Sequence, residues 1–145
     1  MVGHDLKRFL DAQEISFRDA FTEIENGKKR SHWMWYIFPQ LAGLGSSKTS
    51  IFYSIKDLNE ATLYLHDPVL GERLINISKL LTDIKNKSAH EIFGCPDDLK
   101  LRSCMTLFAM VKDTHPVFQQ VIDQYFGGKM DERTLRLISE SESLK

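Results

Sequence analysis

The sequence predicts an all-α protein, with residues 1–145 forming a single compact domain of about seven or eight short helices. Apolar residues recur every three or four positions along most of the chain, which is the helical period. The apolar segments begin at capping residues and end at glycine or proline. No stretch alternates apolar and polar residues as a half-buried strand does. With 42% hydrophobic residues, the chain can bury a core without disulfides or metal ions.

The N-terminal part is expected to form two helices. The first follows Asp5, a suitable N-cap, and ends near Glu14. The second begins at Ser16, where Asp19 completes a near capping box, and ends at Gly27, which suits the left-handed residue after a helix. Their apolar stripes are Leu6, Phe9 and Leu10, then Phe17, Ala20, Phe21 and Ile24.

The middle of the chain contains one ambiguous segment and two clear helices. Residues 48–55 fit either a short helix or an extended piece, because periodicity does not decide between them. Asp57 caps the next helix, and Pro68 occupies the first position of the helix after it. The core stripe of that helix is Leu70, Leu74, Ile77, Leu81 and Ile84.

Two helices follow in the next part of the chain. Ser88 and Glu91 form a capping box that opens a short helix, and Gly94 ends it. Residues 98–112 form the second helix, which is apolar almost all round after Met105. We therefore expect this second helix at the centre of the domain.

The C-terminal part contains the last two predicted helices. Pro116 begins one of them and Gly127 ends it, while Asp131 caps the other. Residues 139–145 are rich in serine and glutamate and are expected to form a frayed tail.

Composition argues against several functional classes. The chain has 19 Lys and Arg against 20 Asp and Glu, which does not favour a broad nucleic-acid surface but leaves room for a local basic pocket. Cys95 and Cys104 lack zinc-ligand spacing, so no metal site and no cofactor are expected; Cys104 fits a helix core and Cys95 a surface turn. The polar N-terminus and the lack of a long apolar run indicate no signal peptide, no membrane association and a cytoplasmic location.

Residues 32–38 are the most unusual segment, with two Trp, one Tyr, one Phe and one His. Packing of a core is an equally open explanation for so dense an aromatic cluster. Trp33 and Trp35 are two positions apart and cannot share one helical face, so we expect one to face the core and the other a groove. A tryptophan in a groove offers a flat surface on which a base or a nicotinamide-like ring can stack.

Polar groups flank this segment on both sides. Lys29 and its cationic neighbours favour a neutral His32, which suits a hydrogen-bonding or general-base role; a solvent-facing His32 is the alternative. Gly43, Gly45 and Ser46 belong to a loop that can present backbone N–H groups to an anion, with a plain turn as the alternative.

The start of the helix at Asp98 completes the candidate site. Asp97 can cap this helix, and the Ser103 hydroxyl either bonds back to a helix carbonyl or lines a pocket. The predicted ligand-binding residues are Lys29, His32, Trp35, Gln40, Gly43, Gly45, Ser46, Asp97, Lys100 and Ser103. No catalytic residue is assigned, because no nucleophile, metalloprotease, Walker or Rossmann motif is present.

Several motifs closely resemble the domain-of-unknown-function 1810 family over nearly the whole chain. They are the His-Trp-Met-Trp…Phe-Pro-Gln core of residues 27–46, Glu60-Ala61 with Tyr64-Leu65, Leu70-Gly71 with Arg73-Leu74, Ile92-Phe93-Gly94, and residues 97–108. The resemblance implies a mainly helical fold and no established activity. Cys104 departs from the pattern, where a second serine is expected, so a catalytic thiol is not implied. A more distant similarity, in helical character and a Trp/Lys/Asp pocket, is to the NADAR superfamily, which is linked to NAD and ADP-ribose N-glycosidic chemistry.

We therefore expect a protein that binds or processes a nucleotide or ADP-ribose-like ligand in a pocket built on residues 32–46 and the helix start at Asp98. Its partner would be an anionic small molecule or nucleotide, and whether it is an enzyme stays open. One alternative is a non-enzymatic interaction module that uses the exposed part of the aromatic segment. Another is a Trp-rich core with no site. The sequence does not indicate an oligomeric state.

Overall fold

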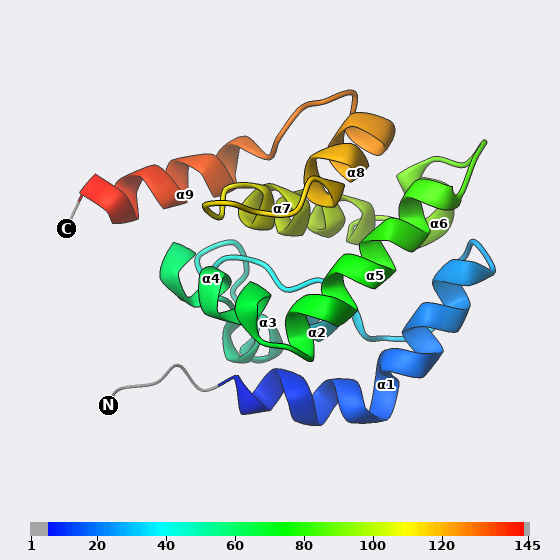
Figure 1. The fold of residues 1–145 in the computed structure, drawn as a ribbon, viewed down its shortest axis with the longest axis horizontal. Coiled ribbons are helices and arrows are strands. Elements are labelled where there is room, and N and C mark those ends of the chain that lie inside the picture. The colour runs from blue at the N-terminus through cyan, green and yellow to red at the C-terminus, as the bar shows by residue number, and fades with distance from the viewer. Residues whose placement is uncertain (1–5, 144–145) are drawn as a thin grey trace.

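The computed structural model describes residues 6–143, and these residues contain nine helices joined by loops (Figure 1). In chain order they are α1 (Lys7–Glu25), α2 (Met34–Ile37), α3 (Lys48–Phe52), α4 (Leu58–His66), α5 (Leu70–Asp83), α6 (Ala89–Phe93), α7 (Asp97–Ala109), α8 (Val117–Phe126) and α9 (Glu132–Ser143). Within these residues there is no strand, and one isolated parallel bridge pairs Leu41 with Ile55. The predicted all-α class is confirmed.

The prediction of two N-terminal helices is wrong, because α1 is one continuous helix of 19 residues. Its axis bends on the way (Figure 1). Ser16 does not cap a new helix; its side-chain oxygen instead accepts a hydrogen bond from the Tyr36 hydroxyl at 2.9 Å. The expected end is correct: Gly27 has φ +78° and closes a Schellman motif, in which Lys28 N–H bonds to Glu23 O. The expected N-cap, Asp5, lies outside the described residues.

Side-chain caps set the starts of three other helices as predicted. Asp57 accepts a hydrogen bond from Glu60 N–H at 2.9 Å at the start of α4. Ser88 and Glu91 form the predicted capping box of α6, and Gly94 ends that helix with φ +75°. Asp131 accepts from a backbone N–H in the first turn of α9. These caps act within one turn of the chain, which is why the sequence reveals them.

Three further helices have bounds that differ from the prediction. α7 runs from Asp97 to Ala109, whereas the sequence predicts a helix over residues 98–112. α5 begins at Leu70 rather than at Pro68, because the Asp67 carboxylate accepts hydrogen bonds from the N–H groups of Val69 and Leu70. α9 stays helical through Ser143, past Ser139, where the sequence predicts the start of a frayed tail; residues 144–145 lie outside the described part.

The centre of the core is α7, as predicted. All its residues from Ser103 to Phe108 are buried, and it packs against α4, α6, α8 and α9. α5 packs against α1, α4 and α8. α1 and α8 lie on different sides of α5 (Figure 1). The two central helices contact each other through Ser78 and Met105.

Side chains of α1 hold the segments that form the candidate site. Buried Gln13 donates through Nε2 to the Tyr36 carbonyl at 2.8 Å and to the Tyr64 hydroxyl at 2.9 Å. Arg8 donates to the carbonyls of Phe52 and Ser54, each at 2.8 Å. Because these bonds engage carbonyls of α2 and of the end of α3, the side chains of α1 fix these two segments relative to each other.

The Glu23 carboxylate holds the loop between α1 and α2 in place through hydrogen bonds. It accepts hydrogen bonds from the N–H groups of Arg30 (2.6 Å) and Ser31 (2.9 Å), from the Ser31 hydroxyl (2.6 Å) and from Trp33 Nε1 (2.9 Å). Burial raises the pKa of Glu23, but these hydrogen bonds outweigh it and lower the pKa to about 2. The charged carboxylate therefore stabilises the fold.

Close contact between α4 and α5 depends on a glycine. A Cβ on Gly71 would lie 1.9 Å from the carbonyl oxygen of Leu65, so the helix start cannot accept a side chain there without a shift of backbone. We predict that Gly71→Ala lowers the free energy of unfolding by about 1–3 kcal/mol, measured by urea denaturation. Glu72→Ala, on the exposed side of the same turn, should change it by less than about 0.5 kcal/mol. Equal effects of the two substitutions would contradict this packing.

The Glu23 hydrogen bonds predict an acid-dependent stability. The folded pKa lies below that of an unfolded glutamate, so the unfolded state takes up the proton first. The stabilisation is thus fully present above about pH 4.5 and is lost as the pH falls towards about 2. Glu23→Gln should flatten the dependence of unfolding free energy on pH in this window. The exposed Glu25→Gln on the same helix is the control; an identical pH profile for both variants would refute the assignment.

Candidate functional site

The two tryptophans face different ways, as the spacing predicts. Trp33 is buried, packs against the rings of Phe38 and Phe93, and is tied to Glu23 by its indole N–H. Trp35 is only partly buried and lines two cavities. Trp33 therefore belongs to the core and borders only one of these two cavities, whereas Trp35 borders both.

The first cavity, called here the lysine cavity, has a volume of about 310 Å³. Its lining residues are Lys29, His32, Trp33, Met34, Trp35, Tyr36, Thr49, Asp97 and Lys100. The Asp97 carboxylate lies between two ammonium groups, at 2.9 Å from Lys29 Nζ and 3.2 Å from Lys100 Nζ. Lys100 Nζ also lies 4.0 Å from the centroid of the Trp35 ring, a cation–π distance.

The charges of the lysine cavity leave one positive charge in excess. Lys29, Lys100 and Asp97 are all largely buried, with side-chain exposures of 10%, 22% and 19%. Screening by water is weaker at such partly buried positions, so the excess charge favours an anion there. His32 is exposed at the rim of this cavity.

The second cavity, called here the loop cavity, has a volume of about 290 Å³. Its lining residues are Trp35, Gln40, Leu41, Ala42, Gly43, Leu44, Gly45, Ser50, Ile51, Tyr53 and Ser54, and none of these is charged. Gly43 has φ +101°, a conformation that favours glycine. A Cβ on Gly45 would lie 2.7 Å from Ser50 Oγ, so glycine lets this loop approach α3 closely.

The predicted site residues are thus divided between two cavities that share Trp35. Lys29, His32, Asp97 and Lys100 lie in one cavity, while Gln40, Gly43 and Gly45 lie in the other.

Two predicted site residues line neither cavity. Ser46 is exposed on the loop, and Ser103 donates its hydroxyl back to the Leu99 carbonyl at 3.2 Å. The bond from Ser103 to a helix carbonyl is one of the two alternatives that the sequence left open for this residue. Asp97 also does not cap α7, because its carboxylate is taken up by the two lysines.

Sequence reasoning missed the residues that complete the site from a distance. Glu23 holds the loop that carries Lys29 and Trp33, and nothing in its local sequence distinguishes it from Glu25. The wall formed by Ser50, Ile51 and Tyr53 comes from residues 48–55, where periodicity was ambiguous.

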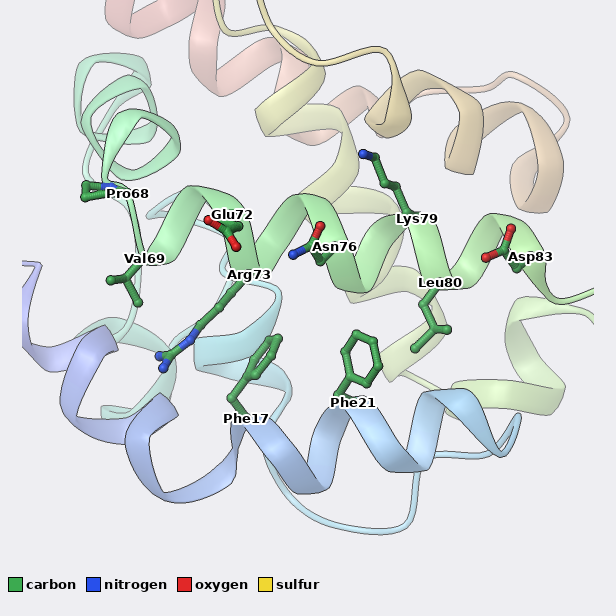
Figure 2. A pocket seen from close by; sticks show the side chains of 10 residues that line it. All are labelled: Phe17, Phe21, Pro68, Val69, Glu72, Arg73, Asn76, Lys79, Leu80 and Asp83. Atoms are coloured by element: carbon green, nitrogen blue, oxygen red, sulfur yellow. The ribbon is translucent and has the colours of Figure 1, made fainter.

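A larger cavity, of about 530 Å³, lies between α1 and α5 and contains no predicted site residue (Figure 2). Phe17 projects from α1 towards Arg73 on α5, and Phe21 projects towards Leu80 on the same helix. The Arg73 guanidinium is already engaged, at 5.2 Å from the Phe17 ring centroid and 3.9 Å from the Glu14 carboxylate. This cavity offers an aromatic wall on α1 and a polar wall of mixed charge on α5, formed by Glu72, Asn76, Lys79 and Asp83.

The described residues contain no candidate metal-binding group, and one of the two cysteines is buried. No group of three His, Cys, Asp or Glu side chains in residues 6–143 is placed to hold a metal ion. Cys95 is exposed and Cys104 is buried, as predicted, and burial raises the pKa of the Cys104 thiol. A neutral, buried thiol is not a nucleophile. No helix in this part of the chain is both long and apolar enough to cross a membrane.

Comparison with known proteins identifies the family. The chain is similar to the crystal structure of the conserved hypothetical protein Rv1873 from Mycobacterium tuberculosis, with 47% sequence identity, a TM-score of 0.91, and coverage of 93% of this chain and 96% of that one. No curated protein matches the chain. The model of the family described as "Protein of unknown function (DUF1810)" matches residues 3–138. Since that match spans well over half of the sequence, the chain belongs to the DUF1810 family.

Proposed function

We propose that this protein binds a nucleotide or ADP-ribose-like ligand across the lysine cavity and the loop cavity. The observation that carries the proposal is the position of Trp35, a partly exposed indole shared by both cavities, with the Lys100 ammonium 4.0 Å from its ring centroid. An aromatic face and cations side by side are what a ring joined to a phosphate requires.

The sizes and charges of the two cavities agree with such a ligand. Each alone is at the lower end of the roughly 300–1,000 Å³ typical of small-molecule sites, and together they fall within it. The lysine cavity supplies Lys29 and Lys100 for a phosphate, which would replace Asp97 as a partner of these ammonium groups. Asp97 and His32 also line this cavity, which places a carboxylate and an imidazole beside the proposed phosphate. The unpaired cysteines and a nucleotide ligand fit a cytoplasmic site of action.

A second candidate function, a protein-interaction module, is favoured by exposed apolar residues on α3. The side chains of Ile51 and Phe52 are 60% and 57% exposed, and Ile51 also lines the loop cavity. Exposed apolar patches of this kind mark interaction surfaces. This candidate surface lies on α3, whereas the sequence suggested the exposed part of the aromatic segment. A Phe52→Ser variant that changes self-association in sedimentation analysis, with no ligand response in the wild type, would favour this candidate.

The ligand proposal predicts a fluorescence response from one tryptophan. Trp33 is buried and bonded and does not line the loop cavity, so a ring bound in that cavity should change the emission of Trp35. Titration with AMP, ADP-ribose and NAD should change the wild-type emission and raise the melting temperature. Trp35→Phe should abolish the emission change, and Lys100→Met should weaken binding roughly tenfold, because a charge-assisted contact is lost.

Lys112→Met is the matched control for Lys100→Met. Lys112 is exposed and follows the C-terminal end of α7, whereas Lys100 lies in the first turns of that helix. The control should bind like the wild type. If no probe changes the emission or the melting temperature of the wild type, the proposed function is wrong.

A further inference from the structure

Gln40 is a buried polar residue whose side chain lacks a partner. It is 8% exposed, lines the loop cavity, and its Nε2 atom is buried without a hydrogen bond. Its backbone is fixed, because its carbonyl accepts a hydrogen bond from Ile55 N–H at 2.8 Å. A buried amide donor without a partner is costly and rare in folded proteins, so it is a candidate for meeting a ligand.

The two cavities beside Trp35 differ in charge. The loop cavity is lined by no charged side chain, and its polar side chains are Gln40, Ser50, Tyr53 and Ser54. Ser50 and Ser54 already donate their hydroxyls to the carbonyls of Ser47 and Ile51. Gln40 and Tyr53 are therefore the side chains left to select the neutral part of a ligand, and of these two only Gln40 carries a separate donor and acceptor. Lys29 and Lys100 receive the anionic part.

We infer that the loop cavity recognises the base of a purine nucleotide that presents a hydrogen-bond donor next to an acceptor, as adenine does with its 6-amino group and N7. The carboxamide of Gln40 carries the complementary acceptor and donor, and glutamine pairs with adenine through these two atoms. Because Nε2 is buried in this structure, pairing through both amide atoms requires a change of the Gln40 rotamer that turns the amide edge into the loop cavity. This inference rests on the proposed function and adds to it the identity of the base.

The shape of the loop cavity supports a flat occupant. Trp35 and Tyr53 both line it, and the loop at Gly45 approaches Ser50 so closely that no Cβ fits between them. A Cβ on Gly45 would also lie 3.7 Å from the Trp35 ring. The base would thus lie beside the indole, with Gln40 at its edge and the phosphate directed towards Lys100.

Isothermal titration with matched nucleotides tests this inference. The probes are AMP, IMP (which has a carbonyl in place of the amino group), 7-deaza-AMP (which lacks N7) and ribose 5-phosphate. On the wild type we expect AMP to bind roughly tenfold or more tighter than IMP or 7-deaza-AMP. Gln40→Met should bring the three nucleotides to similar affinity and leave ribose 5-phosphate unchanged. Lys100→Met should weaken all four by a similar factor.

Three other results of this titration would each contradict a different claim. If AMP binds the wild type but IMP and 7-deaza-AMP bind equally well, the base assignment is wrong and the proposed function stands. If Gln40→Met retains the preference for AMP, Gln40 is not the reader of the base. If none of the four probes binds the wild type, both the inference and the proposed function fail. The wild-type comparison decides the base even where Gln40→Met does not fold.

Discussion

The Glu23 carboxylate fixes the backbone on which the candidate site is built. It accepts two backbone N–H groups, a hydroxyl and an indole N–H from residues 30–33. A loop that otherwise has many accessible conformations is held in one, so Lys29 reaches Asp97 and Trp33 enters the core. The neighbouring Trp35 then has to point away from the core, towards the cavities.

The site combines this fixed loop with two further supports from α1. Gln13 holds α2 through the Tyr36 carbonyl, and Arg8 holds the end of α3 through the carbonyls of Phe52 and Ser54. Trp35 on α2 and the wall on α3 are therefore held by the same helix. The lysine cavity closes against α7, whose start carries Asp97 and Lys100. The site thus depends on packing between segments far apart in the sequence.

What the sequence could reveal was decided by the range of each interaction. Caps such as Ser88 with Glu91, and the end of α1 at Gly27, involve neighbours within a few residues and were predicted correctly. The different directions of Trp33 and Trp35 agree with their spacing of two residues, although Trp33 lies just before α2 with φ −135°. Which of them is buried depends on Glu23, ten residues away, and was not predictable. The uninterrupted α1 escaped prediction because Ser16 fits a helix start and a helix interior equally well.

Hydrogen exchange of the two indole N–H protons, followed by NMR, tests most directly whether Glu23 determines which tryptophan is buried. The Trp33 signal should exchange slowly in the wild type and faster in Glu23→Gln, because its hydrogen bond to the carboxylate is weakened. The Trp35 signal should exchange faster than that of Trp33 and be unaffected by this substitution. Equal protection of both signals, or unchanged protection of Trp33 in Glu23→Gln, would contradict the account.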